Sequence, residues 1–301
     1  MRAMIHIGLL TALFTGGYVA MRKIPASNCN FLHYEQTVVT ADGMQYCGSG
    51  AAYFVDLQKL PFPVEVKLTA DHAPALDVAA NYTLTLMTDK GTSYEQPLRP
   101  SELAVTQTQK LHLLVVDASL EDYQHIHPVP DGETGNWTFS FTPHRPGPYH
   151  VYAQFIPSLS MREMIGETQI AVPGDSGPSV RHGLAAFKDG DYIYNLSVPD
   201  NTLTPGADAT LTLSVQRADG GKVQLQPVMG TFAHLVAFDP ARDGVAHLHP
   251  TLTGKETDPT HPELSFVINL AQPGHYRIWG QVKLDDRERY VPFDIDVAKA
   301  G

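Results

Sequence analysis

Short runs of alternating apolar and polar residues recur along the chain from residue 61 onward. They include residues 64–68, 82–86, 137–141 and 147–155. Because successive side chains of a β-strand point to opposite faces of its sheet, this alternation predicts strands with one buried face. The 24 glycines and 23 prolines are spread along the chain, as expected for turns between short strands. No long stretch beyond the N-terminus has helical periodicity, so we predict an all-β protein.

The second half of the chain repeats the first half. Three pairs of segments correspond, namely residues 82–86 with 209–213, 137–141 with 264–268, and 146–149 with 273–276. A fourth pair matches Tyr152-Ala-Gln154 with Trp279-Gly-Gln281. A tandem duplication of a β-module of about 110 residues explains this pattern. That size is typical of an antiparallel Greek-key β-sandwich, either cupredoxin-like or immunoglobulin-like.

The repeat divides the chain into segments. We predict a signal peptide or membrane anchor at residues 1–27 and an N-terminal segment with both cysteines at residues 28–60. The first module follows at residues 61–173, a linker at residues 174–183 and the second module at residues 184–301. A chain of 301 residues is long enough for two domains of ordinary size, each with its own core.

Each module carries one copy of the histidine pattern H-x12-H-x-H-P. The two copies are His112, His125 and His127, and His234, His247 and His249. Residues i and i+2 of a strand point to the same face, so the last two histidines of each copy can reach one ion. The first histidine lies on the preceding apolar run and joins them if the two runs pair. Three imidazoles suit copper or zinc.

The second module has a further soft ligand within reach. Met229 precedes His234 by five residues, whereas the first module has Gln107 at the matching position. A thioether favours copper, particularly Cu(I), over zinc. We therefore predict a copper site formed by Met229, His234, His247 and His249. A weaker second site is predicted at His112, His125 and His127.

The same composition limits what such sites could do. A blue-copper electron-transfer site needs a Cys thiolate, and both modules lack cysteine. The chain also offers no clear acid/base pair or nucleophile arrangement, so we predict metal binding, storage or delivery without enzymatic activity. The alternative interpretation is structural, with the histidines serving as packing and hydrogen-bonding residues.

Charge narrows the choice of partners. Lys and Arg number 21 against 32 for Asp and Glu, a formal net charge of -11, and no basic block is present. Because phosphate contacts need clustered Lys and Arg, we do not expect nucleic-acid binding.

The N-terminus predicts export. A charged start, an apolar run at residues 3–20 and basic residues after it are typical of a signal peptide or a retained membrane anchor. We expect a protein in the periplasm or on the outer face of the inner membrane. In such an oxidising compartment, Cys29 and Cys47 would most simply form a disulfide.

At the histidine patterns and the Pro-Gly-x-Tyr segments, the chain resembles bacterial exported proteins built from tandem cupredoxin-like or immunoglobulin-like modules. The resemblance covers roughly residues 62–298 and implies copper handling. By architecture alone, the chain is similar to periplasmic accessory subunits of membrane redox or photosynthetic reaction-centre complexes. This second resemblance implies another function, in which a membrane-anchored scaffolding subunit docks on a periplasmic protein partner and the histidines are structural.

Overall fold

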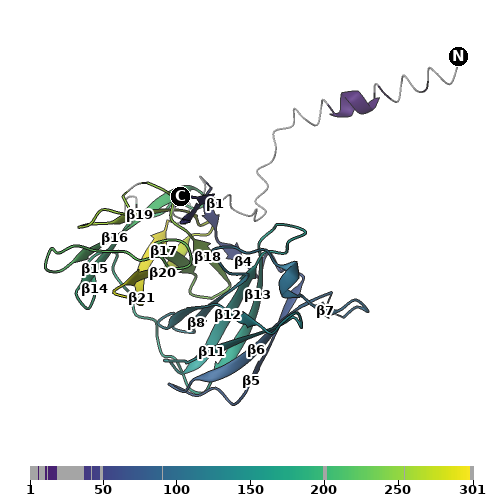
Figure 1. Ribbon diagram of the computed structural model, residues 1–301, viewed down its shortest axis with the longest axis horizontal. Helices are drawn as coiled ribbons and strands as arrows, with labels where there is room; N and C mark the ends of the chain where they lie inside the picture. Colours follow the sequence, from purple (N-terminus) through teal and green to yellow (C-terminus); the bar gives the residue numbers. More distant parts are fainter. Residues whose placement is uncertain are drawn as a thin grey trace. The chain divides into compact units, whose positions relative to one another are not determined.

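The computed structural model contains two β-sandwiches that follow each other along the chain (Figure 1). It describes residues 6, 11, 13–18, 37–41, 43–47, 50–89, 91–198, 202–253 and 255–298. Residues 33–301 form one compact unit that holds both sandwiches, and residues 1–32 form another. Among the described residues, no helix has both the length and the apolarity for a membrane crossing. The predicted anchor lies mostly outside the described residues and stays a prediction.

The first sandwich pairs two sheets of antiparallel strands. One sheet contains β5 (Val64–Ala70), β6 (Ala80–Thr88), β7 (Gln96–Pro97), β10 (Val129–Pro130) and β11 (Asn136–Phe141). The other contains β8 (Leu111–Asp117), β9 (Tyr123–Ile126), β12 (Gly147–Phe155) and β13 (Met164–Val172), in the order β13-β12-β8-β9. A short 3-10 helix, η1 (Pro100–Glu102), precedes β8.

The second sandwich repeats the pairing order of seven strands of the first. One sheet contains β14 (Phe187–Asp189), β15 (Tyr192–Ser197), β16 (Asp208–Arg217) and β19 (Glu263–Asn269). The other contains β17 (Ala233–Phe238), β18 (Gly244–Leu248), β20 (Gly274–Leu284) and β21 (Arg287–Val297). In both sandwiches the chain changes sheets repeatedly between pairing strands, as in a Greek key.

The predicted all-β fold and its duplication are therefore confirmed. Burial alternates along β6 and β16 as the apolar pattern requires, with one face in the core and one face outside. Each sandwich has its own cluster of buried apolar side chains, with Trp137 in the first and Phe266 in the second. Burying an apolar side chain of this kind stabilises the fold by about 1.5–3 kcal/mol.

The N-terminal segment adds strands to the second sandwich. A hairpin of β1 (Thr37–Val39) and β2 (Gln45–Cys47) comes first. β3 (Ala52–Tyr53) then pairs in parallel with β19, and β4 (Val55–Asp56) pairs antiparallel with β18. Residues 52–56 thus extend both sheets of one sandwich. The predicted disulfide involves Cys29, which lies outside the described residues, so the disulfide stays a prediction.

The pairing of β4 with β18 requires a glycine at position 244. A Cβ added to Gly244 would lie 1.9 Å from the Val55 carbonyl oxygen and 2.8 Å from a ring carbon of Phe54. We expect Gly244→Ala to displace β4, to cost about 1–3 kcal/mol of unfolding free energy, and to speed tryptic cleavage after Lys59. Urea unfolding and limited proteolysis would measure both effects.

Gly50→Ala is the matched control, because a Cβ at Gly50 meets no atom within 4 Å. Equal cleavage rates after Lys59 in the two variants would show that β4 does not depend on the close approach at Gly244.

The β8 strand is buried at every position, although a sandwich strand has only one face in its own core. Leu111, Leu113 and Val115 belong to the core of the first sandwich. The alternate residues, including His112 and Leu114, face the other way and are also buried. β17 and β18 are buried throughout in the same manner. Both sheets therefore have a covered outer face.

The outer faces of these two sheets cover each other. The ring centroids of Tyr123 and Phe238 lie 5.6 Å apart, and those of Tyr152 and Phe238 lie 5.8 Å apart. The Tyr152 hydroxyl donates to the Arg242 carbonyl at 2.6 Å. In the opposite direction, the indole N–H of Trp279 donates to a carbonyl of the first sandwich, that of Leu120, at 3.1 Å. The contact between the sandwiches is thus built from pairs of reciprocal interactions.

Candidate metal centre

The two histidine patterns form two compact groups on these covered faces. His112 lies on β8, His125 lies on the adjacent strand β9, and His127 follows directly after β9. One ring nitrogen from each lies within 4.8 Å of the other two, and we call this group the first triad. The second triad has the same arrangement on β17, β18 and the residues after it, and consists of His234, His247 and His249. Both predicted sets of histidines are therefore brought together.

The inner nitrogens of the triads are spaced like ligands of one ion. His112 Nδ1 lies 3.2 Å from His125 Nε2 and 3.2 Å from His127 Nε2. His234 Nδ1 likewise lies 3.2 Å from His247 Nε2. Nitrogens bound tetrahedrally to zinc at their usual bond length are about 3.3 Å apart. The observed separations match the edge of such a coordination polyhedron.

The outer nitrogens determine where the protons of the first triad are. His112 Nε2 lies 3.0 Å from the Thr106 carbonyl, which can only accept, so His112 Nδ1 carries a lone pair. His125 Nδ1 lies 3.0 Å from Gln281 Oε1, and the amide nitrogen of Gln281 donates to Glu288 at 2.8 Å. This orients the amide, so His125 Nδ1 donates and His125 Nε2 carries a lone pair. A hydrogen bond between His112 and His125 cannot satisfy two facing lone pairs, whereas a cation can.

The second triad has the same surroundings. His234 Nε2 donates to the Val228 carbonyl at 3.2 Å. His247 Nδ1 lies 2.7 Å from Gln154 Oε1 and donates to it. Imidazoles that bind metals usually donate their other N–H to a carbonyl or carboxylate oxygen in this way, which fixes the ring and its tautomer.

Each triad is held by a glutamine from the opposite sandwich. Gln281, on β20 of the second sandwich, holds His125 of the first. Gln154, on β12 of the first sandwich, holds His247 of the second. Sequence reasoning used these glutamines only as markers of the repeat. A sequence signal for them was available, because each glutamine occupies the same place in its copy of the repeat. In the structure, each one pairs in register with the first histidine of its own module, His112 or His234.

Burial keeps five of the triad histidines neutral. Removal from water lowers the pKa of His112 to about 3 and that of His127 to about 4. The same cause, reinforced by the neighbouring imidazoles, holds the pKa values of His125, His234 and His247 well below the usual 6.5. At neutral pH these rings therefore offer lone pairs without first losing a proton.

Met229 and Gln107 occupy matching loops next to the triads. Each follows the residue whose carbonyl holds a triad histidine, and each has a positive φ, 52° for Met229 and 45° for Gln107. Gln107 is buried, and its side-chain oxygen has no hydrogen-bond partner among the described residues. Among the described histidine, cysteine, aspartate and glutamate side chains, only histidines converge on each site. Met229 as a fourth ligand stays a prediction. Gln107 occupies the position in the first module that Met229 occupies in the second.

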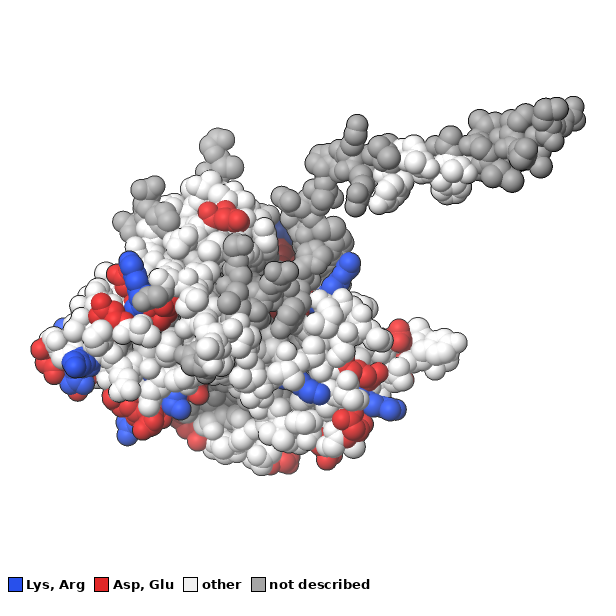
Figure 2. All heavy atoms as spheres, turned by 45° about the horizontal axis from the view of Figure 1, so that its top comes forward, with Lys and Arg blue, Asp and Glu red and all other residues white. Residues whose placement is uncertain are grey.

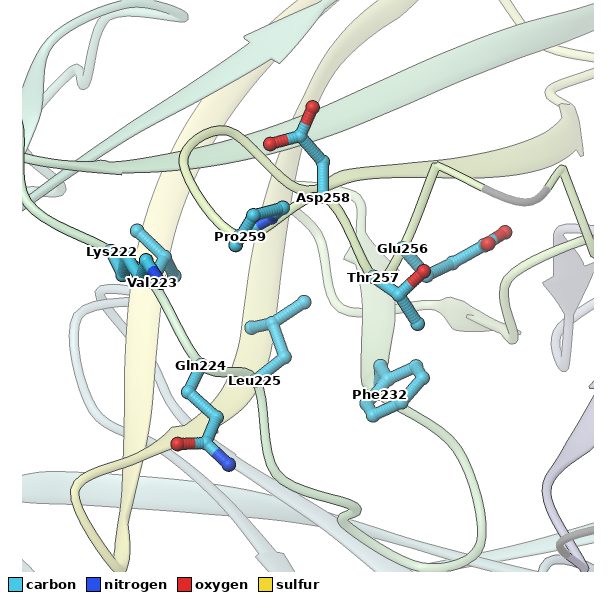
Figure 3. A pocket seen from close by; sticks show the side chains of 9 residues that line it. All are labelled: Lys222, Val223, Gln224, Leu225, Phe232, Glu256, Thr257, Asp258 and Pro259. Carbon is cyan, nitrogen blue, oxygen red and sulfur yellow. The ribbon is translucent and has the colours of Figure 1, made fainter.

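A hollow elsewhere in the second sandwich brings together no group of three candidate metal ligands among the described residues. It has a volume of about 280 Å³, and its walls include Leu225, Phe232 and Pro259 (Figure 3). Its two carboxylates accept hydrogen bonds from their own loop, Glu256 from Thr253 and Asp258 from Thr260. On the molecular face in Figure 2, basic side chains are scattered among acidic ones and form no cluster. Neither feature competes with the triads as a functional site.

Comparisons with known proteins identify the module. Structures with some similarity include the native conformation of Escherichia coli α2-macroglobulin, at 12% identity over 78% of this chain and 17% of that chain, with a TM-score of 0.27. Salmonella α2-macroglobulin reacted with methylamine gives 13% identity, 78% and 16% coverage and a TM-score of 0.25. This chain thus spans less than a fifth of those proteins, and TM-scores this low support no argument. None of the curated proteins matches it. A family model described as a domain of unknown function (DUF8832) matches residues 63–168 and 186–299, so the chain belongs to that family.

Proposed function

We propose that this protein binds copper, without enzymatic activity, at the two triads enclosed between its sandwiches, with zinc as the second candidate. One observation carries the proposal: the unprotonated nitrogens of His112 and His125 face each other at 3.2 Å. A neutral pair in this geometry is repulsive, and a shared ion removes the repulsion. Imidazole is a good ligand for both metals.

The burial of the triads favours binding, storage or delivery over catalysis. His112 and His234 have at most 1% of their surface exposed, so a bound ion would be shielded from most substrates. His127 and His249 keep partial exposure, which gives an ion a route to each triad. The N-terminal apolar run supports the further proposal that the protein is exported and works in the periplasm or on the outer face of the inner membrane.

The test is metal uptake by the purified full-length chain in mild detergent. We expect the wild type to retain copper after dialysis against micromolar copper, measured by elemental analysis. Removing two ligands from one triad, His125→Ala with His127→Ala or His247→Ala with His249→Ala, should lower the copper content, and the quadruple variant should retain none. Each ligand lost weakens a site because the remaining imidazoles cannot complete the coordination.

His72→Ala with His261→Ala is the matched control, since both histidines are exposed and lie outside the triads. Circular dichroism should confirm that every variant keeps its β-structure. A wild type that takes up no copper or zinc at micromolar concentrations would mean that the triads are structural.

A further inference from the structure

The two triads lie against each other. The ring centroids of His125 and His247 are 5.0 Å apart, and those of His125 and His234 are 5.6 Å apart, although these pairs belong to different triads. Within a triad, the rings of His112 and His125 are 5.4 Å apart, and those of His234 and His247 are 5.3 Å apart. The spacing between rings of different triads is thus close to the spacing between rings of one triad. The six rings form one continuous cluster, and two ions bound in it would be only a few ångströms apart.

The ligands of this cluster carry no charge of their own. Among the described residues, both converging groups consist of histidines, with no carboxylate or thiolate in either of them. The charge of a bound ion is therefore not cancelled by its ligands. The repulsion between two ions scales with the product of their charges, so it is about four times larger for two divalent ions than for two monovalent ions at the same separation. Burial strengthens both repulsions, because the interior screens charge less than water does.

A carboxylate, that of Glu288, is linked to the first triad by hydrogen bonds. Glu288 accepts hydrogen bonds from the Gln281 amide at 2.8 Å and from the Tyr290 hydroxyl at 3.1 Å. Gln281 in turn accepts from His125. This chain of hydrogen bonds places negative charge behind a first-triad ligand, where it favours a divalent ion.

Resting on the metal-binding function proposed above, we propose that the two triads form a single paired centre that holds two cuprous ions but only one divalent ion. The divalent ion occupies the first triad. The centre thereby selects monovalent copper by the charge of the second ion.

The test compares zinc and cuprous ion in separate titrations of the full-length chain, with a competing chelator and, for copper, under anaerobic reducing conditions. Each triad's own affinity is measured in the variant that lacks the other triad, His125→Ala/His127→Ala or His247→Ala/His249→Ala. In the wild type we expect two cuprous ions per chain. For zinc we expect one tightly bound ion. The second zinc ion should bind the second triad at least about 100-fold more weakly than it binds that triad when the first triad is removed. This factor corresponds to two divalent ions about 6 Å apart with the screening of bulk water. The second cuprous ion should lose affinity by a smaller factor, whose logarithm is about a quarter of the logarithm of the factor for zinc.

Two further variants sharpen the test. Each single-triad variant should bind one zinc ion, and the variant that keeps the first triad should bind it more tightly. Glu288→Gln should weaken the first zinc ion more than the first cuprous ion, and His72→Ala/His261→Ala should change neither.

Three results would overturn the paired centre: two zinc ions bound as tightly as in the single-triad variants, a single cuprous ion per chain, or equal losses for the two metals. Absence of both metals from the wild type and from every variant is a different pattern, and it would overturn the metal-binding function itself.

Discussion

Acidification from pH 7 to pH 5 is expected to unfold the metal-free protein. The pKa values of five buried or partly buried triad histidines are lowered in the folded state, to about 3 for His112 and about 4 for His127, and well below 6.5 for His125, His234 and His247. In the unfolded chain they return to about 6.5. The unfolded state therefore binds more protons below this pH, and stability falls as the pH falls.

The size of the effect follows from linkage. The stability from these histidines is complete above about pH 6.5 and is lost as the pH drops toward the folded-state pKa values. Each histidine contributes a slope of about 1.4 kcal/mol per pH unit, so five together contribute about 7 kcal/mol per pH unit. Because small proteins are stable by about 5–15 kcal/mol, one to two pH units should suffice for unfolding.

The measurement is the free energy of unfolding in urea at a series of pH values, with a chelator present. His112→Leu with His234→Leu should reduce the slope by about 2.7 kcal/mol per pH unit, because two proton sites are removed. The exposed pair His72→Ala with His261→Ala should leave it unchanged. A stability that varies by less than about 1 kcal/mol between pH 7 and pH 5 would contradict the prediction.

Replacement of Arg277 by Met is expected to cost about 3–5 kcal/mol of unfolding free energy. This guanidinium is fully buried and lies between the sandwiches. It donates to Asp294 at 2.8 Å, to Glu121 at 3.1 Å, and to the carbonyls of Leu120 and Val180 at 2.6 Å each. Met keeps much of the volume but leaves two carboxylates without their buried cation. Urea unfolding of the full-length chain would measure the loss.

The pKa of Asp294 indicates how strongly this site depends on its donors. Burial alone would raise it, but hydrogen bonds from His275 and Arg277 outweigh burial and lower it to about 2. Neutralising both carboxylates in the Arg277→Met background, by Glu121→Gln and Asp294→Asn, should therefore recover a large part of the lost stability. If the triple variant is no more stable than Arg277→Met, then loss of packing and not of charge pairing causes the effect.

The sequence was sufficient for the fold class and for the composition of the triads. Period-two alternation marks strands such as β6, and the same spacing in both copies marks the histidines. These are local signals, because a strand's pattern and the reach between i and i+2 do not depend on the rest of the chain.

The sequence was not sufficient for the relation between the triads. Which outer faces of two sandwiches cover each other depends on surfaces far apart in the chain. One hint was present, since 111–116 and 233–238 contain apolar residues at positions on both faces, as a sheet covered on both sides requires. The aromatic residues Tyr152 and Trp279, used above only as markers of the repeat, contact the other sandwich for the same reason.

The pairing of the N-terminal segment could not be predicted from its own residues. β3 and β4 are two residues long each, too short for a periodic pattern. Their positions depend on the strand edges of β18 and β19. The need for glycine at position 244 follows only from its contact with Val55 in the folded structure.

The reciprocal contacts between the sandwiches have an evolutionary consequence. Each recurs with the roles exchanged: Gln281 holds His125 as Gln154 holds His247, and Tyr152 and Trp279 each donate to the opposite sandwich. Such an interface is isologous, the kind that a homodimer forms about a two-fold axis. The chain thus has the organisation of an ancestral dimer fused end to end. Fusion makes assembly of the six-histidine cluster intramolecular, so assembly no longer depends on protein concentration. Fusion also allows the two halves to differ in sequence, as they do at Glu288 and Met229.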